Sequence, residues 1–254
     1  MLPVLVSPFH DTDGPMFDHL ASIRPQLEEI FARAFISLSP LTQQTQPERV
    51  EQLQADEFFI LKFNEADTWI GDHFVAGYRN AVDYCQQDRV LHLCTLDRVV
   101  FALQTQYKEQ FVADLEMANH LQSPLLFQRS EAAWQTHPRN YREIEYLATK
   151  TGEVILGRSL DFVWCHMVIR AGQLQEILPR LKSQDLSVVA EMVLLLQDDL
   201  QTKDVDWLAW EDPFIFGCDP ATMKKEFEND PQQHRKRLGY IIPILQRLLE
   251  TIEY

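Results

Sequence analysis

The chain has 254 residues, of which 46% are hydrophobic, so it is long enough and apolar enough to form a folded domain with a sizeable core. Its net charge of −15 argues against binding to nucleic acid or to anionic membranes, because both depend on lysine and arginine. No run of about twenty apolar residues predicts a membrane span, and no CxxC spacing links the four cysteines. We expect a cytoplasmic protein whose thiols are reduced.

The first half of the chain alternates between strands and helices. Short connections join these elements, which predicts a parallel sheet with helices on both faces. The carboxyl ends of its strands, where ligands of such sheets bind, carry "SPFHD", "SLSPLT", "KFNEAD" and "TLDR". The predicted strands are 4–6, 35–38, 58–63 and 90–94. The predicted helices are 16–31, kinked or split at Pro25, 46–55, 68–85 with Thr68 as a possible N-cap, and 99–119.

The second half is less regular. We expect strands within 124–130 and 160–170, a helical stretch over 132–156 that breaks near His137-Pro138, and helices over 173–182 and 186–197. Residues 204–216 read as irregular or β, and a C-terminal helix extends from about 231 to 252. With no repeat or linker, the chain reads as one continuous α/β domain, 1–254, made of two halves, 1–119 and 120–254, with a sheet extension and an irregular C-terminal part that ends in that helix.

The motif "TLDR" places Asp97 and Arg98 directly after the fourth predicted strand. Asp97 has two interpretations. Its carboxylate suits the start of the following helix, where the N-terminal dipole favours negative charge. Alternatively, it holds a divalent cation that neutralises a diphosphate, because hard cations prefer carboxylate oxygens.

Two other motifs also leave alternatives open. "HDTDG" resembles the D-x-D-G motif of haloacid-dehalogenase-type phosphatases, with Asp11 and Asp13 as the key carboxylates and "LLLQDDL" (Asp198 and Asp199) as a later acidic motif. "WLAWED", residues 207–212, places two tryptophans beside two acids, which is typical either of a sugar-stacking wall or of core packing. Dinucleotide-binding, Walker, serine-hydrolase and H-E-x-x-H motifs are absent from the sequence.

A wider pattern joins "TLDR" to "FQRSEAAWQTHPRNYREIE" and to later acids. Its members are Asp97-Arg98, Arg129-Ser130, Thr136-His137-Pro138, Glu145, Glu191 and Trp210-Glu211. This pattern resembles a set of uncharacterised bacterial proteins with a glycosyltransferase-A-like fold, within the nucleotide-diphospho-sugar transferase superfamily. The chain departs from that set at three places. Thr95 and Val189 stand where aspartates are expected, and residues 165–168 replace a glycine-containing turn.

The resemblance implies a Rossmann-like, mostly parallel sheet and a nucleotide-sugar donor whose sugar is transferred to an unknown acceptor. Ser7, Pro8 and Phe9 would border the nucleotide, Asp97 would hold Mn²⁺ or Mg²⁺, and Arg98 would fix the loop or meet phosphate. Glu191 or Glu211 would accept the acceptor's proton as a general base. The three departures favour a rival interpretation, in which the chain is a non-catalytic binding or scaffold protein with the same fold.

Overall fold

The computed structural model describes residues 1–163 and 166–251. A seven-stranded sheet in the order β3-β2-β1-β4-β6-β5-β7 runs through both halves of the chain. All its neighbouring strands are parallel except β6, which is antiparallel to β4 and to β5. The strands are β1 (Val4–Phe9), β2 (Ala34–Leu38), β3 (Phe59–Phe63), β4 (Val90–Leu93), β5 (Leu125–Arg129), β6 (His166–Arg170) and β7 (Gln201–Val205).

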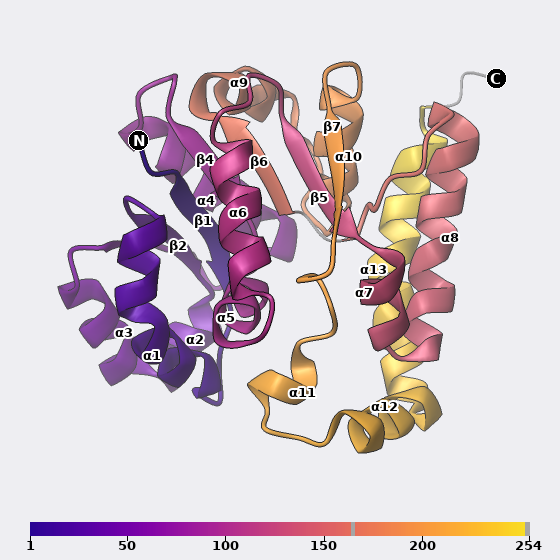
Figure 1. The fold of residues 1–254 in the computed structure, drawn as a ribbon, viewed down its shortest axis with the longest axis horizontal. Helices are drawn as coiled ribbons and strands as arrows, with labels where there is room; N and C mark the ends of the chain where they lie inside the picture. The colour runs from indigo at the N-terminus through magenta and orange to yellow at the C-terminus, as the bar shows by residue number, and fades with distance from the viewer. Residues whose placement is uncertain (164–165, 252–254) are drawn as a thin grey trace.

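Helices cover both faces of this sheet, as the alternating pattern predicts (Figure 1). In chain order they are α1 (Pro15–Ile30), α2 (Pro40–Thr45), α3 (Pro47–Ala55), α4 (Ile70–Tyr84), α5 (Leu96–Gln104), α6 (Lys108–Ala118), α7 (Glu131–Thr136), α8 (Arg139–Leu156), α9 (Ala171–Ile177), the 3₁₀ turn η1 (Leu178–Arg180), α10 (Ser187–Leu196), α11 (Asp212–Ile215), α12 (Pro220–Asn229) and α13 (Pro231–Leu249). None of them is both long and apolar enough to cross a bilayer, over the residues described.

Two hydrophobic clusters lie on opposite faces of the sheet. The first joins α1, α3, α5 and α6 to the segment after β7, and the second joins α4, α8, α9, α10 and α13. Helices α8 and α13 pack side by side at the end of the molecule next to β5 and β7 (Figure 1). A side chain in one cluster therefore lies on the opposite face of the sheet from a side chain in the other.

The four strands predicted in the first half are confirmed as one parallel group, with β1 between β2 and β4. Three local predictions are wrong. Helix α1 continues through Pro25, whose missing N–H removes only one bond while Ile23 and Leu27 stay buried. The predicted helix 99–119 is two helices, because the chain turns at 105–107, where the Thr105 hydroxyl donates to the Phe101 carbonyl. The N-cap of α4 is Trp69 rather than Thr68.

The C-terminal part is more regular than expected. Residues 201–205 form the edge strand β7, and three helices follow, so that the segments 206–211 and 216–219 are the irregular connections between them. Helix α13 ends at Leu249, short of the predicted end, because Glu250 and Thr251 form a turn; Ile252 lies outside the described residues.

Candidate functional site at the β1–β4 edge of the sheet

The order in which strands are added to the sheet changes sides at β1: the first strands extend the sheet in one direction and β4 extends it in the other. Strands β2 and β3 lie on one side of β1, and β4 returns to its other side. The two strands are hydrogen-bonded neighbours, and the Cys94 amide donates to the Val6 carbonyl at 3.0 Å. In open α/β sheets, ligands bind outside the carboxyl ends of the strands at such a switch point. His10 and Asp11 follow β1 here, and Thr95 and Asp97 follow β4.

Asp97 lies in the first turn of α5, at the edge where the sequence places it. Its side chain is half-buried, and Oδ1 accepts a hydrogen bond from the Arg98 amide at 2.8 Å. The N-cap residue of α5 is Thr95, whose hydroxyl lies 3.1 Å from His166 Nε2. Asp97 therefore satisfies a free N–H of the helix start from inside the first turn, and one carboxylate oxygen has no hydrogen bond to another described residue.

Arg98 points inward from the same turn and is 1% exposed. Its guanidinium donates to the carbonyls of Leu208, at 3.1 Å, and of Ala209, and Nη1 lies 2.5 Å from Glu211 Oε2. Arg98 thus fixes the segment 206–211 against α5, and its burial keeps it from a ligand at the surface. This segment is the connection between β7 and α11.

Glu211 ends that segment and Asp212 begins α11, and both lie near α5. Burial raises the pKa of Glu211 well above its usual range, and the neighbouring Arg98 cation acts in the opposite direction. Burial also raises the pKa of Asp212, and the hydrogen bond of 3.0 Å that Trp210 Nε1 donates to it acts to lower that pKa. Asp97 raises the pKa of both groups electrostatically, so the three carboxylates share one region. Asp212, one of the two acids of "WLAWED", is half-buried in the same region as Asp97.

Glu191, the other predicted general base, lies in a different place. It belongs to α10, whose apolar side chains pack in the cluster on the opposite face of the sheet from α5. Its carboxylate is completely buried and accepts from the amides of Lys182 and Ser183 at 2.9 Å and from Arg247 at 2.5 Å. Glu191 therefore joins the loop before α10 to α13. The structure does not bring it together with Asp97.

The residues predicted to border the nucleotide lie inside β1, which is three residues longer than expected. Ser7 is fully buried and its hydroxyl donates to the Pro8 carbonyl; Phe9 is also buried, and Pro8 is half-buried. The exposed positions at this end of β1 begin at His10, whose Nδ1 lies 2.8 Å from the Ser39 hydroxyl.

The carboxylates of the phosphatase alternative are separated. Asp11 is buried and accepts from the amides of Gly14 and Phe17, so it caps the start of α1. Asp198 and Asp199 precede β7, at the amino end of a strand parallel to β5, and thus at the opposite edge of the sheet. The two motifs of that alternative do not meet.

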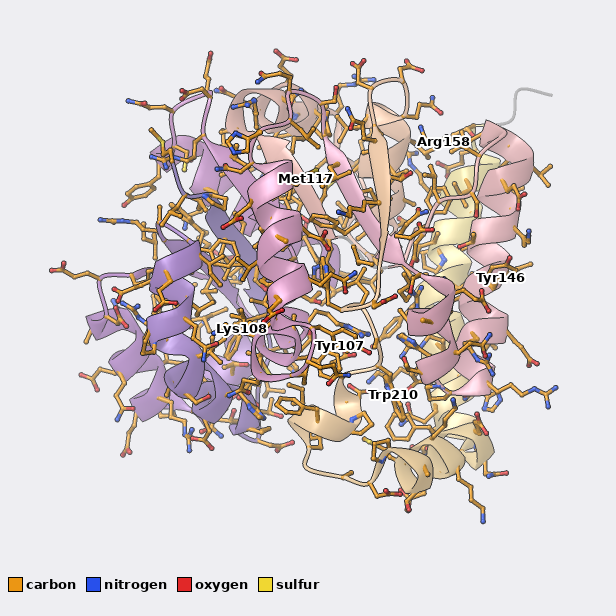
Figure 2. All side chains as sticks on the ribbon, in the orientation of Figure 1. Tyr107, Lys108, Met117, Tyr146, Arg158 and Trp210 are labelled. Carbon is orange, nitrogen blue, oxygen red and sulfur yellow. The ribbon has the colours of Figure 1, made fainter. Side chains whose placement is uncertain are left out.

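The tryptophans of "WLAWED" are core residues and not a stacking wall. Trp207 is completely buried and its indole N–H donates to Asp114 at 2.9 Å. Trp210 is 6% exposed and contacts the ring of Phe227 in α12 (Figure 2). Neither indole face is open to a sugar.

The other residues of the wider pattern form a buried ionic network that sequence reasoning did not foresee. Arg129, at the end of β5, pairs with Asp161 at 2.6 Å and with Glu145 at 2.5 Å, and Arg237 of α13 lies 2.7 Å from the same Glu145. The Arg129 guanidinium also stacks on Trp134, 3.4 Å from the ring centroid. This network ties β5, α8 and α13 together.

The Thr136-His137-Pro138 turn holds the segment 206–211 from its other side. The Thr136 hydroxyl accepts from the Trp210 amide at 2.8 Å, and His137 Nε2 lies 3.4 Å from an Arg98 nitrogen. Burial, helped by the neighbouring arginines, lowers the pKa of His137 well below its usual value, so it is neutral. Of the departures, Val189 is buried in the core and Cys165 lies outside the described residues.

Two comparisons complete the description of the site. Within residues 1–163 and 166–251, no group of three or more histidine, cysteine, aspartate or glutamate side chains is arranged to hold a metal ion. No family model matches the chain, and no curated protein sequence matches it either.

Proposed function

We propose that the protein binds a nucleotide-diphospho-sugar at the β1–β4 edge of the sheet, as a glycosyltransferase-A-like protein. The observation that carries the proposal is the half-buried carboxylate of Asp97 at the topological switch point. The mostly parallel sheet with helices on both faces supports this assignment, although other Rossmann-like proteins share that architecture. The buried residues of the pattern support it by holding the segment 206–211 at the same edge.

A divalent cation fits this site only together with the ligand. Asp97 would supply one carboxylate oxygen, and no cluster of three ligating side chains stands ready among the described residues. The diphosphate would supply other oxygens, and the cation would neutralise their charge. We therefore expect Mn²⁺ or Mg²⁺ alone to bind weakly, and to bind more tightly when a nucleoside diphosphate is present.

Binding without transfer is the second candidate, and a specific observation favours it. A general base must be able to reach the proton that it accepts. Glu191 is enclosed by two amides and Arg247, and Glu211 is buried against Arg98. Release of nucleoside diphosphate from a bound sugar donor would demonstrate transfer or hydrolysis; binding without release would identify a binding protein.

The test measures thermal stability and calorimetric binding with UDP-, GDP-, ADP- and dTDP-sugars, in Mn²⁺ and in EDTA. A ligand at a hundred times its Kd should add about 2.7 kcal/mol to the free energy of unfolding. Asp97→Asn should remove the part of the affinity that depends on Mn²⁺. Asp72→Asn is the matched control, because Asp72 is also half-buried in the first turn of a helix, α4, but packs on the other face.

Thr95→Asp should strengthen the response to Mn²⁺, because it adds a second carboxylate two residues before Asp97. The proposal fails if none of these sugars binds the wild type in Mn²⁺ and Thr95→Asp creates no binding. It also fails if the two asparagine variants behave alike.

A further inference from the structure

Two completely buried histidines lie beside the candidate site, on the face of the sheet that α5 and α6 cover. His92 is in β4 and His166 begins β6, and their ring centroids are 5.8 Å apart. Both rings contact Trp207, at 6.5 and 5.4 Å between centroids. We call His92 and His166 the histidine pair. Trp207 is the buried anchor of the segment 206–211.

The surroundings of the pair are aromatic and contain few polar partners. Three phenylalanine rings lie about His92 at 6.0–6.1 Å: Phe31, Phe111 and Phe127. Both ring nitrogens of His92 and the Nδ1 atom of His166 are buried with no hydrogen-bond partner among the described residues. Only His166 Nε2 is engaged, by the Thr95 hydroxyl. Buried polar atoms without partners are rare in native proteins, and each one destabilises the packed state.

No carboxylate is available to stabilise a positive charge on either ring. Arg98 of α5, the nearest cation, opposes protonation of His166, and Glu211 is already paired with Arg98. Asp114 of α6 is bound to the Trp207 indole and to Lys203 of β7. Among residues 1–163 and 166–251, Cys94 of β4 is a further titratable residue on these strands, and it is a buried thiol. Burial lowers the pKa of His92 to about 3 and that of His166 well below its usual value.

We propose that the histidine pair is an acid-operated latch on the segment 206–211. While both rings are neutral, Trp207 packs against them and the segment is held at the β1–β4 edge. When a proton reaches either ring, the aromatic surroundings offer the charge no partner, and Trp207 must move for water to reach the ring. The inference does not depend on a nucleotide-sugar.

The sign and size of the effect follow from proton linkage. A histidine exposed by opening has a pKa near 6.5, above that of the closed state, so the opened form binds more protons as the pH falls. Closed-state stability is complete above about pH 6.5 and is lost below it. Between pH 7 and pH 5, opening is favoured about 25-fold by one histidine and several hundredfold by both. Local opening needs less free energy than global unfolding, so it should appear first.

Amide hydrogen exchange tests the latch in the full chain. The amides of Ala209 and Trp210 are hydrogen-bonded within or to this segment, and those of β2 serve as the reference for global unfolding. After correction for the intrinsic rate, protection of Ala209 and Trp210 should fall several hundredfold from pH 7 to pH 5. It should stay below that of β2 and depend less on added urea, because local opening needs less free energy and exposes less surface than the global unfolding that β2 reports.

Three variants separate the latch from general acid sensitivity. His92→Phe keeps an aromatic ring among aromatic neighbours, and His166→Gln keeps a hydrogen-bonding side chain near Thr95; each should reduce the fall to about 25-fold. His120→Gln, at an exposed histidine, should behave as the wild type. The proposal is overturned if protection in 206–211 does not fall, if it equals that of β2 at both pH values, or if His92→Phe and His166→Gln both leave the fall unchanged.

Discussion

The buried network about Glu145 gives a stability prediction whose size can be worked out. Glu145 is completely buried and accepts from both Arg129, at 2.5 Å, and Arg237, at 2.7 Å. Removal of its carboxylate leaves Arg129 with Asp161, at 2.6 and 2.8 Å, but leaves Arg237 with no carboxylate among the described residues. Because Arg237 is only 7% exposed, its charge would be buried and uncompensated.

Breaking a buried ion pair on one side costs about 3–5 kcal/mol, so Glu145→Ala should lose that much of the free energy of unfolding. With a urea m-value of about 3 kcal/mol/M, the midpoint of urea denaturation would fall by about 1–1.7 M. The double variant Glu145→Leu with Arg237→Met removes one positive and one negative charge together. It keeps the Arg129–Asp161 pair, so it should lie within about 1 kcal/mol of the wild type.

Urea denaturation followed by circular dichroism measures the wild type, Glu145→Ala, and a double-mutant cycle of Glu145→Leu, Arg237→Met and their combination. A loss below about 1 kcal/mol for Glu145→Ala would refute the argument. A double variant that loses as much as the sum of the single changes would refute it too, because the loss would then come from packing and not from an unpaired charge.

Three further variants test other contacts. Glu191→Gln should lose about 2 kcal/mol of unfolding free energy, because its hydrogen bond with Arg247 loses the negative charge. It should leave nucleotide-sugar binding unchanged in calorimetry, since Glu191 lies on the other face of the sheet. Weakened binding would show that Glu191 has a role in the site. Gly152→Ala should cost about 1–3 kcal/mol in thermal or urea unfolding, because the new Cβ would lie 2.1 Å from Phe162. Gly239→Ala, whose new Cβ would have nothing within 4 Å, should stabilise its helix by up to about 1 kcal/mol. Equal effects of the two substitutions would contradict the packing described. Trp207→Phe should lose about 1–3 kcal/mol in the same assay, because Asp114 loses its indole donor, and an unchanged midpoint would exclude that hydrogen bond as a stabilising contact.

The fold class could be predicted because the spacing of apolar residues and the turn-forming residues indicate the same strands and helices over the first half. Buried parallel strands read as short apolar runs, and the parallel direction of β1, β2 and β4 follows from their alternation with helices. The reversal of β6 could not be predicted, since direction within a sheet depends on contacts between distant segments. Strand β7 was missed because "QTKDV" is polar, as an edge strand exposed on one side is allowed to be.

The candidate site was predictable in its position but not in its members. Asp97 lies at the predicted edge because the end of β4 was placed within a residue. The position of Glu191 on the other face of the sheet could not be predicted, because its helix, "SVVAEMVLLL", is apolar on most sides and gives no indication of the face on which its acid lies. Asp161 is a single charge beside apolar residues and Arg237 ends the basic run 234–237, so only the structure shows that they share a network with Arg129 and Glu145.

The pattern that carries the resemblance has a physical explanation apart from chemistry. Arg98 and Thr136 bind the segment 206–211 from two sides, and Glu145 joins the helices behind it. Buried charges and turns of this kind tolerate few substitutions, because a lost partner leaves an unpaired group in the interior. The pattern therefore specifies how the segment is placed at the sheet edge. Ligand binding depends on the few polar side chains that remain accessible at that edge, which is why Asp97 is a sharper test of function than any of the buried residues.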